Sequence, residues 1–139
     1  MGAKPAHEKT SSFYDIKYAE SDNPYNWERT GKVAVGLRDN ETNVARSAVV
    51  KLGSEDYRMW FSYVHSRVGK YRIGFAQSKD GYDWLRQDDL AGIGLDNEQA
   101  KEMICYPSIF QLNQKIYMLY NGDEFGKDGF GVAVWRGDS

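Results

Sequence analysis

The chain has 139 residues, of which 41% are hydrophobic, so it is long enough to fold as one domain around its own core. Eighteen Lys and Arg nearly balance twenty Asp and Glu, which argues against charge-driven binding to nucleic acid or to an anionic membrane. The lone cysteine, Cys105, excludes a disulfide framework and a thiolate metal cluster. With no apolar leader and no long apolar run, we expect a soluble, cytoplasmic protein.

From residue 13 onward the sequence is patterned for β-structure. Ten Tyr, six Phe and four Trp occur with only three Pro, and this composition favours strands over helices. Residues 1–12 are polar and unpatterned, so we expect a flexible tail there and one domain over residues 13–139. Short runs of aromatic and β-branched residues predict strands at 13–20, 25–29, 46–52, 57–64, 71–78, 82–87, 106–112, 115–121 and 129–135.

Two sequence patterns recur along these strands. The run that begins at Ile16 returns 57 residues later at Ile73, and again at Phe130, with an alanine in the same place each time. The run Ser47-Ala-Val-Val, followed by Arg58-Met-Trp-Phe-Ser, has a counterpart about sixty residues later. Self-similarity at such a period indicates one supersecondary unit that is used repeatedly.

Turn signals divide each repeat into strands. Asp80-Gly81 predicts a hairpin, because glycine tolerates the positive φ of tight turns, and Asn23-Pro24 takes the equivalent place. The segments 53–56 and 113–114 predict the turns between the first two strands of each unit. The unit is therefore a four-stranded antiparallel meander, which is the form of a β-propeller blade.

The fold class predicted from these units is all-β, with about two propeller blades in the chain. It would begin with the last two strands of one blade, continue through a complete blade at 46–87 and finish with three strands of another. Trp27 and Trp84 share the 57-residue offset, and we expect both to pack in the core between blades. The recurring alanines would lie where one sheet packs closely on the next.

Four motifs carry a resemblance to a known family: Tyr57-Arg-Met-Trp-Phe-Ser, the run from Tyr71 to Trp84, Tyr106-Pro-Ser-Ile-Phe and Tyr117-Met-Leu-Tyr-Asn-Gly. Together they resemble the five-bladed β-propeller glycoside hydrolases, the arabinanase, invertase and levansucrase relatives, over residues 13–136. A whole propeller of this kind needs roughly 300 residues, so the resemblance covers only the carboxy-terminal blades. The family places one catalytic Asp in its first blade and another in a middle blade, and no matching Asp-Pro segment occurs here.

The topology of a blade places each loop at one of two ends of the sheet. Connections into the innermost strand and loops between the second and third strands share one end, where the resemblance places the substrate. The residues that this end collects are Glu41, Arg46, His65, Arg67, Glu102, Tyr106, Asn121, Asp123 and Glu124.

Glycoside hydrolysis needs two carboxyl groups, about 5 Å apart for retention and roughly 6.5–9.5 Å apart for inversion. Glu102 is the main candidate for the acid, because it precedes an inner strand and a channel-facing carboxyl there would be partly desolvated. Glu41 is its counterpart one blade earlier. The alternative is that both are solvated loop carboxylates. No phosphate-cradling loop, metal set or cofactor motif is present in the sequence.

Substrate binding is expected from polar and aromatic side chains at the same end. Arg46 and Arg67 offer planar guanidinium groups suited to sugar hydroxyls or a carboxylate, or else they neutralise nearby carboxylates. Tyr106 could stack on a sugar ring, whereas Trp60 fits the core better because it lies mid-strand in an alternating pattern. The remaining candidates for ligand contact are Asn121, Asp123 and Glu124.

Three hypotheses follow for function. The first is a glycosidase or sugar transferase, with its second carboxylate supplied elsewhere. The second is a carbohydrate-binding module without turnover. The third is a structural module that completes a β-sheet arrangement, because incomplete blades expose strand edges that invite pairing. The third hypothesis predicts a homodimer or larger assembly.

Overall fold

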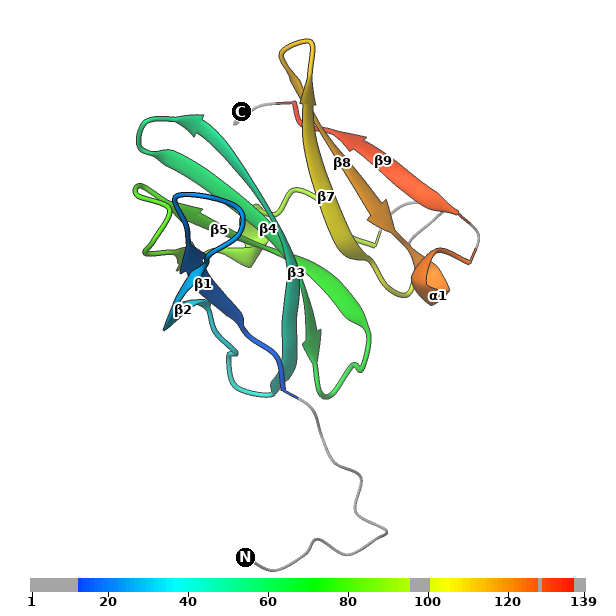
Figure 1. Ribbon diagram of the computed structural model, residues 1–139. Helices are drawn as coiled ribbons and strands as arrows, with labels where there is room; N and C mark the ends of the chain where they lie inside the picture. The colour runs from blue at the N-terminus through cyan, green and yellow to red at the C-terminus, as the bar shows by residue number, and fades with distance from the viewer. Residues whose placement is uncertain (1–12, 96–100, 128, 137–139) are drawn as a thin grey trace, which may run out of the picture.

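The computed structural model describes residues 13–95, 101–127 and 129–136, and it is built almost entirely of antiparallel strands (Figure 1). The predicted all-β class is confirmed. The tail expected over residues 1–12 lies outside the described residues. The strands are β1 (Ile16–Glu20), β2 (Glu28–Val35), β3 (Glu41–Gly53), β4 (Asp56–His65), β5 (Tyr71–Ser78), β6 (Leu85–Arg86), β7 (Cys105–Leu112), β8 (Lys115–Asn121) and β9 (Phe130–Val134). Two one-turn elements accompany them, η1 (Asp88–Leu90) and α1 (Asp123–Gly126).

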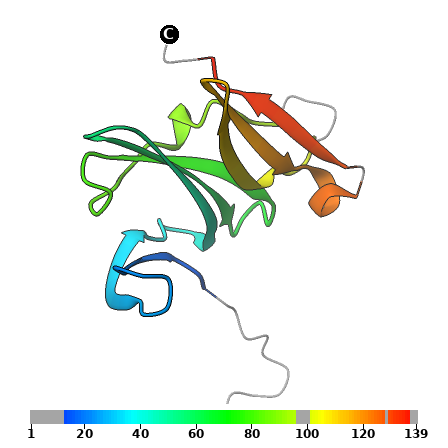
Figure 2. The same cartoon turned by 45° about the horizontal axis from the view of Figure 1, so that its top comes forward.

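The strands form three separate sheets that follow the chain in order. β1 pairs with β2, β3 to β6 form a four-stranded meander, and β7 to β9 form a three-stranded one. Figure 2 shows these sheets as layers, with the four-stranded sheet (green) between the other two. Within the described residues, no helix is long and apolar enough to cross a membrane.

Each sheet has two distinct ends. The tight turns 54–55 and 113–114 join β3 to β4 and β7 to β8, and we call this the hairpin end. At the opposite end, β3 and β7 begin and β4 and β8 finish, and we call this the loop end. The two turns lie where the sequence predicted them. Asn113 and Gln114 both have positive φ, as the tight hairpin between β7 and β8 requires.

The middle sheet is buried on both faces. Alternate residues of β4 point to opposite sides, so Met59 and Phe61 pack toward β1 and β2, with Val35 and Ile16. Trp60 points the other way and packs with Phe75, and this second core reaches β8 through Met118 and Tyr120. The outer sheets are each covered on one face only, which leaves large apolar residues of β9 such as Phe130 exposed.

The 57-residue repeat reproduces one turn structure. The Asn23 side-chain oxygen accepts hydrogen bonds from the amides of residues 25 and 26, and the Asp80 carboxylate accepts them from residues 82 and 83. The indole of Trp27 donates to the Pro24 carbonyl at 3.1 Å, as the indole of Trp84 does to Gly81 at 3.2 Å. These bonds hold the segments in turns. The strands predicted at 25–29 and 82–87 therefore begin later, at residues 28 and 85.

The expected core role of the two tryptophans holds for one of them. Trp84 is half-buried and packs on the cluster that contains Met59 and Ala76. Trp27 is 59% exposed, so the expectation that it packs in a core is wrong. The cause is the position of the β1–β2 sheet at the edge of the layers, where no further described sheet covers it. The recurring alanines differ in the same way: Ala76 in the middle sheet is fully buried, and Ala19 in the outer sheet is exposed.

A second repeated feature joins a glycine to an aromatic ring on the neighbouring strand. The ring of Phe61 lies over Gly74, and the ring of Tyr120 lies over Gly131 in the equivalent place. A methyl group on either glycine would overlap the ring. Glycine at these positions thus lets an aromatic side chain cross the strand and close the contact between sheets.

We expect Gly74→Ala to lower the free energy of unfolding by about 1–3 kcal/mol, because the added methyl group overpacks the Phe61 ring. Urea denaturation followed by tryptophan fluorescence measures the change. Gly94→Ala is the matched control, since a methyl group there meets no atom within 4 Å and the backbone φ is not positive. Equal effects of the two substitutions would contradict the role of the ring contact.

Candidate ligand-binding site

Two inner strands carry the same irregularity near the loop end. The pairing of β3 with β4 skips from Ala45 to Ala48, so that Arg46 and Ser47 together oppose one residue. The pairing of β7 with β8 skips from Cys105 to Ser108 in the same manner. Both gaps are β-bulges, and in each the first residue has positive φ, 56° at Arg46 and 58° at Tyr106.

The two bulges bring their side chains together across adjacent sheets. The guanidinium carbon of Arg46 lies 5.4 Å from the centre of the Tyr106 ring. Tyr71, at the start of β5, lies 5.5 Å from the same ring, and Phe125 lies 5.8 Å from both tyrosines. We call Arg46, Tyr71, Tyr106 and Phe125 the Tyr106 cluster. It is an aromatic surface with one guanidinium group at its edge.

Backbone strain is concentrated in this cluster. Phe125 also has positive φ, 57°, inside α1, which is a left-handed turn at this point rather than a regular helix. A non-glycine residue in this region costs on the order of 1 kcal/mol. Three of the four side chains in the cluster are thus presented by an unfavourable backbone conformation.

Hydrogen bonds from the core hold the cluster in place. The amide of Tyr106 donates to the hydroxyl of Ser62 at 2.7 Å, and Ser62 is fully buried in β4. The amide of Ile104 donates to the carbonyl of Tyr71 at 3.1 Å. Tyr71 and Tyr106 are half-buried, whereas Arg46 is exposed and Phe125 is 54% exposed. The cluster therefore has a fixed base and an accessible outer surface.

Asp123 fastens the neighbouring loop. Its carboxylate accepts hydrogen bonds from the amides of Lys101, Glu102 and Met103, at 2.7–3.1 Å. These bonds, led by that of Glu102, lower the pKa of Asp123. The sequence nominated Asp123 as a ligand contact, but the carboxylate is already used to cap the chain before β7. Its structural effect is to join the loop of residues 101–104 to the turn that carries Phe125.

Glu102 lies on that fastened loop, beside the Tyr106 cluster. Its backbone carbonyl accepts a hydrogen bond from Arg72 at 2.9 Å, while its carboxylate lies 3.8 Å from the ammonium group of Lys70. The Glu102 side chain is 72% exposed. A catalytic acid at this position was expected to be partly desolvated, whereas the Glu102 carboxyl group is open to solvent.

Glu41 is buried and ion-paired. Its two carboxylate oxygens accept hydrogen bonds from the Arg86 guanidinium at 2.7 Å each, and the two side chains are only 5% and 10% exposed. Arg86 also binds Asp88 at 2.8 Å and lies over the rings of Phe61 and Tyr63. Burial lowers the pKa of Arg86, but hydrogen bonds to Asp88 and Glu41 outweigh it and the pKa is raised. In this arrangement Glu41 joins β3 to β6.

We expect Glu41→Gln to destabilise the fold by about 1–3 kcal/mol, because the buried Arg86 would lose one of its two carboxylate partners and keep only Asp88. Thermal or urea unfolding measures the loss. Glu124→Gln serves as the control, because its pair with Lys127 is 69% exposed on both sides and such pairs contribute less than about 1 kcal/mol. A Glu41 variant as stable as the wild type would overturn the structural role.

The other sequence candidates lie at the loop end without joining one site. Arg67 is exposed in the β4–β5 loop, where its amide donates to His65. Asn121 ends β8, and Glu124 is exposed and paired with Lys127. Trp60 is a core residue, as expected, with its indole donating to the Ala91 carbonyl.

Sequence reasoning missed Tyr71 and Phe125. Tyr71 begins a predicted strand motif, and Phe125 follows the acidic candidates Asp123 and Glu124. A signal was available for Phe125, because an aromatic residue in Gly122-Asp-Glu-Phe-Gly126 has no strand or helix to pack it. For Tyr71 the proximity to Tyr106 comes from contact between two sheets, which the sequence does not display.

Metal and thiol chemistry have little support among the described residues. No group of three His, Cys, Asp or Glu side chains is placed there to hold a metal ion. Cys105 is fully buried, and burial raises the pKa of its thiol to about 11. A thiol with such a pKa is a poor nucleophile at neutral pH.

Comparison with known proteins finds two similar sequences and no matching family model. The uncharacterized proteins Rv1502 and MT1551 of Mycobacterium tuberculosis, from strains H37Rv and CDC 1551, are each 35% identical to this chain over 120 residues. The match covers 86% of this chain but 39% of each relative. The chain thus spans well under half the length of the relatives that it matches.

Proposed function

We propose that the chain forms part of a carbohydrate-binding β-propeller whose sugar-contacting surface is the Tyr106 cluster. The observation that carries the proposal is the convergence of three strained residues, Arg46, Tyr106 and Phe125, on one exposed surface. Strain of this kind is retained where the surrounding structure fixes a side chain for function. Buried packing alone would not need it, because Phe125 and Arg46 remain accessible.

The chemistry of the cluster suits a saccharide. A sugar ring presents an apolar face of C–H groups and a rim of hydroxyls. Phe125 stacks on Tyr106 at an interplanar angle of 24° and is 54% exposed, so its ring offers an aromatic surface for the apolar face. Arg46 at the edge supplies several N–H donors for hydroxyl or carboxylate oxygens. Among the described residues, Arg46 forms no ion pair that would compete.

Two observations support the propeller part of the proposal. The three sheets, one two-stranded pair and two meanders, pack as layers, and their repeated turns and glycine–aromatic contacts fit one blade used several times. The relatives match this chain over only 39% of their length, so each is roughly 300 residues long, enough for about five blades of sixty residues. The resemblance to five-bladed glycoside hydrolases points in the same direction.

Binding fits the described residues better than turnover. Glu41 is buried but paired with Arg86, and Glu102 is exposed, so neither offers the desolvated carboxyl group without a cationic partner that serves as the acid in glycoside hydrolysis. Hydrolysis is the second candidate, and the fastened position of Glu102 beside the Tyr106 cluster favours it. In that case a second carboxylate must come from outside the described residues.

We expect the protein to bind one or more members of a panel of pentose and hexose oligosaccharides, and Phe125→Ala to weaken that binding about tenfold, because the most exposed aromatic ring of the cluster is removed. Isothermal titration calorimetry measures both. Phe110→Ala is the matched control: Phe110 is also an exposed phenylalanine stacked on a tyrosine, Tyr117, but it lies near the hairpin end. Equal loss in both variants, or no binding to any sugar, would refute the site.

Substitution of Glu102 distinguishes sugar binding from glycoside hydrolysis. If the protein cleaves aryl glycosides, Glu102→Gln should abolish turnover and leave the binding constant unchanged, because the amide keeps the shape of the side chain but cannot transfer the proton. If the protein only binds, wild type shows no turnover and Glu102→Gln changes nothing.

The proposed partner besides a sugar is a second copy of the chain. β9 has one paired edge, with β8, and its outward residues Phe130 and Val132 are 63% and 55% exposed. Edges and apolar faces of this kind invite pairing. We expect a dimer or larger assembly by light scattering at micromolar concentration, reduced by Val132→Lys. A strictly monomeric wild type would contradict this.

A cytoplasmic location remains part of the proposal. Its support is the single cysteine, which is buried as a thiol in the core and has no described partner for a disulfide.

A further inference from the structure

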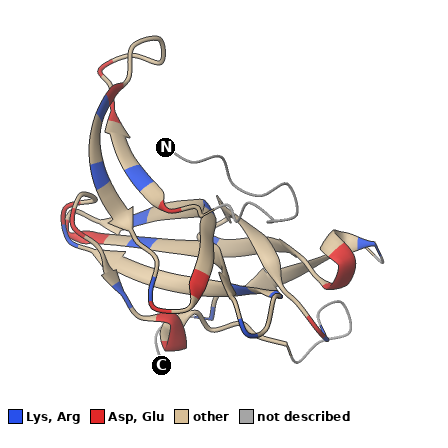
Figure 3. Ribbon diagram, turned by 90° about the horizontal axis from the view of Figure 1, so that it is seen from below, with Lys and Arg blue, Asp and Glu red and all other residues tan. Residues whose placement is uncertain are grey.

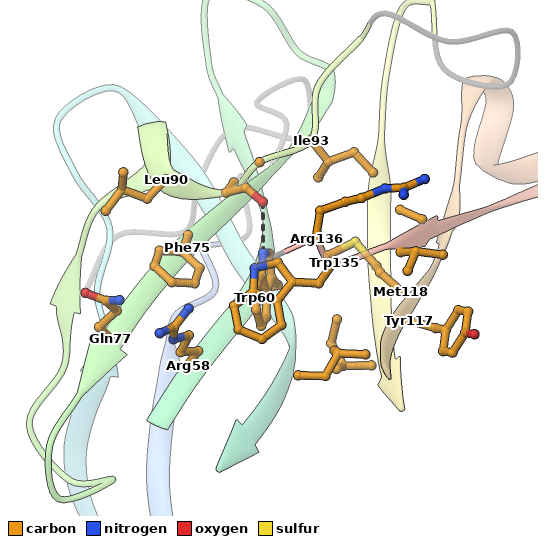
Figure 4. Close-up of a pocket in the computed structure, with 16 residues that line it drawn as sticks. Arg58, Trp60, Phe75, Gln77, Leu90, Ile93, Tyr117, Met118, Trp135 and Arg136 are labelled. Atoms are coloured by element: carbon orange, nitrogen blue, oxygen red, sulfur yellow. Dashed lines mark hydrogen bonds between the residues drawn. The ribbon is translucent and has the colours of Figure 1, made fainter. Parts of the chain in front are cut away.

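A cavity of about 540 Å³ lies at the hairpin end, away from the Tyr106 cluster. It opens between β4 and β5 on one side and β8 and β9 on the other, with the segment 90–93 along its margin (Figure 4). This volume falls within the range of small-molecule sites. Neither the sugar proposal nor any sequence motif accounts for it.

The base of the cavity is aromatic and apolar. Trp60 and Phe75 form it, with ring centres 5.0 Å apart, and Met118 faces them from β8. The indole N–H of Trp60 is already bonded to the Ala91 carbonyl at 3.0 Å, as the dashed line in Figure 4 shows. The base therefore presents no unsatisfied indole donor and suits the flat apolar body of a ligand.

The described residues that line the cavity carry charge of one sign. Arg58 and Arg136 are among them, and no described Asp or Glu is. Arg58 is partly committed, since it pairs with Asp56 at 3.1 Å and its guanidinium carbon lies 5.1 Å from the Trp135 ring. Arg136 follows β9 and is exposed, so its guanidinium is available to a ligand at the mouth.

This local charge contrasts with the rest of the molecule. Acidic and basic residues are interspersed over the sheets in Figure 3, and the chain as a whole carries a net charge of −2. A cavity with an aromatic base and one exposed guanidinium group, that of Arg136, at its mouth favours a ligand with an apolar body that ends in an anionic group.

We propose that this cavity binds a small amphipathic anion, an aromatic carboxylate or sulfonate, whose rings lie on Trp60 and Phe75 and whose anionic group meets Arg136. Occupancy would bridge the middle sheet and the β7–β9 sheet, because the lining residues come from both. The site is independent of the Tyr106 cluster, which lies at the other end of the strands.

The test uses two dyes that differ by one group. Anilinonaphthalene sulfonate carries the anion, and phenylnaphthylamine is its neutral counterpart. We expect saturable binding of the sulfonate dye at one site per chain, with quenching of tryptophan fluorescence, and about tenfold weaker binding of the neutral dye. Arg136→Gln should weaken the sulfonate dye about tenfold and leave the neutral dye unchanged, and because Arg136 is exposed this variant should fold.

A pair of adjacent substitutions locates the dye. Ala133 lines the cavity, so Ala133→Leu should block both dyes, whereas Val132→Leu, on the opposite face of β9 and outside the lining, should block neither. Equal affinity for the two dyes, both in wild type and in Arg136→Gln, would contradict recognition of the anionic group by Arg136. If the dyes still bind to Ala133→Leu, or if wild type shows no saturable dye binding, the cavity is not the binding site. We expect the oligosaccharide affinity of these variants to equal that of wild type, so the dye experiment and the sugar experiment test the two sites independently.

Discussion

The arrangement of the molecule depends on β4, a strand buried on both faces. Met59 and Phe61 pack toward the β1–β2 sheet, while Trp60 packs toward the β7–β9 sheet. Burying side chains of this size contributes on the order of 2 kcal/mol each, so one short strand secures contacts to two other layers. Ser62, next in the strand, anchors the Tyr106 amide and so ties the candidate site to the same element.

The β-bulges convert this repeated architecture into a local site. Without them, β3 and β7 would continue in regular register, and the side chains at 46 and 106 would follow the alternation of their strands. Each bulge inserts one residue and turns the first into the left-handed region. Because the two strands lie next to each other in neighbouring sheets, the two side chains meet.

The two ends of the sheets have different chemistry. At the loop end, the exposed Phe125 ring, the half-buried Tyr106 ring and Arg46 form the surface that we propose for a sugar. At the hairpin end, buried rings and Arg136 line a partly open cavity, which we propose for an amphipathic anion. Two of the nominated carboxylates have structural partners: Glu41, a catalytic candidate, pairs with Arg86, and Asp123, a candidate for ligand contact, accepts amide hydrogen bonds before β7.

The sequence by itself determined the repeating part of this protein. The 57-residue period, the turns at 80–81 and 113–114 and the alternation in β4 depend on neighbours along the chain, so their strands and hairpins could be predicted. The same information placed Arg46 and Tyr106 at one end, because strand direction alone fixes which loops share an end.

Only the tertiary structure decided what those residues do. Glu41 and Arg86 are 45 residues apart, on the two edge strands of the middle sheet, and Arg86 reaches Glu41 across the β4 rings of Phe61 and Tyr63. The contact between Tyr71 and Tyr106 depends on how two sheets pack together. The same holds for the difference between the exposed Trp27 and the half-buried Trp84. Contacts between layers are set by packing over long sequence separations, and a local pattern carries no record of them.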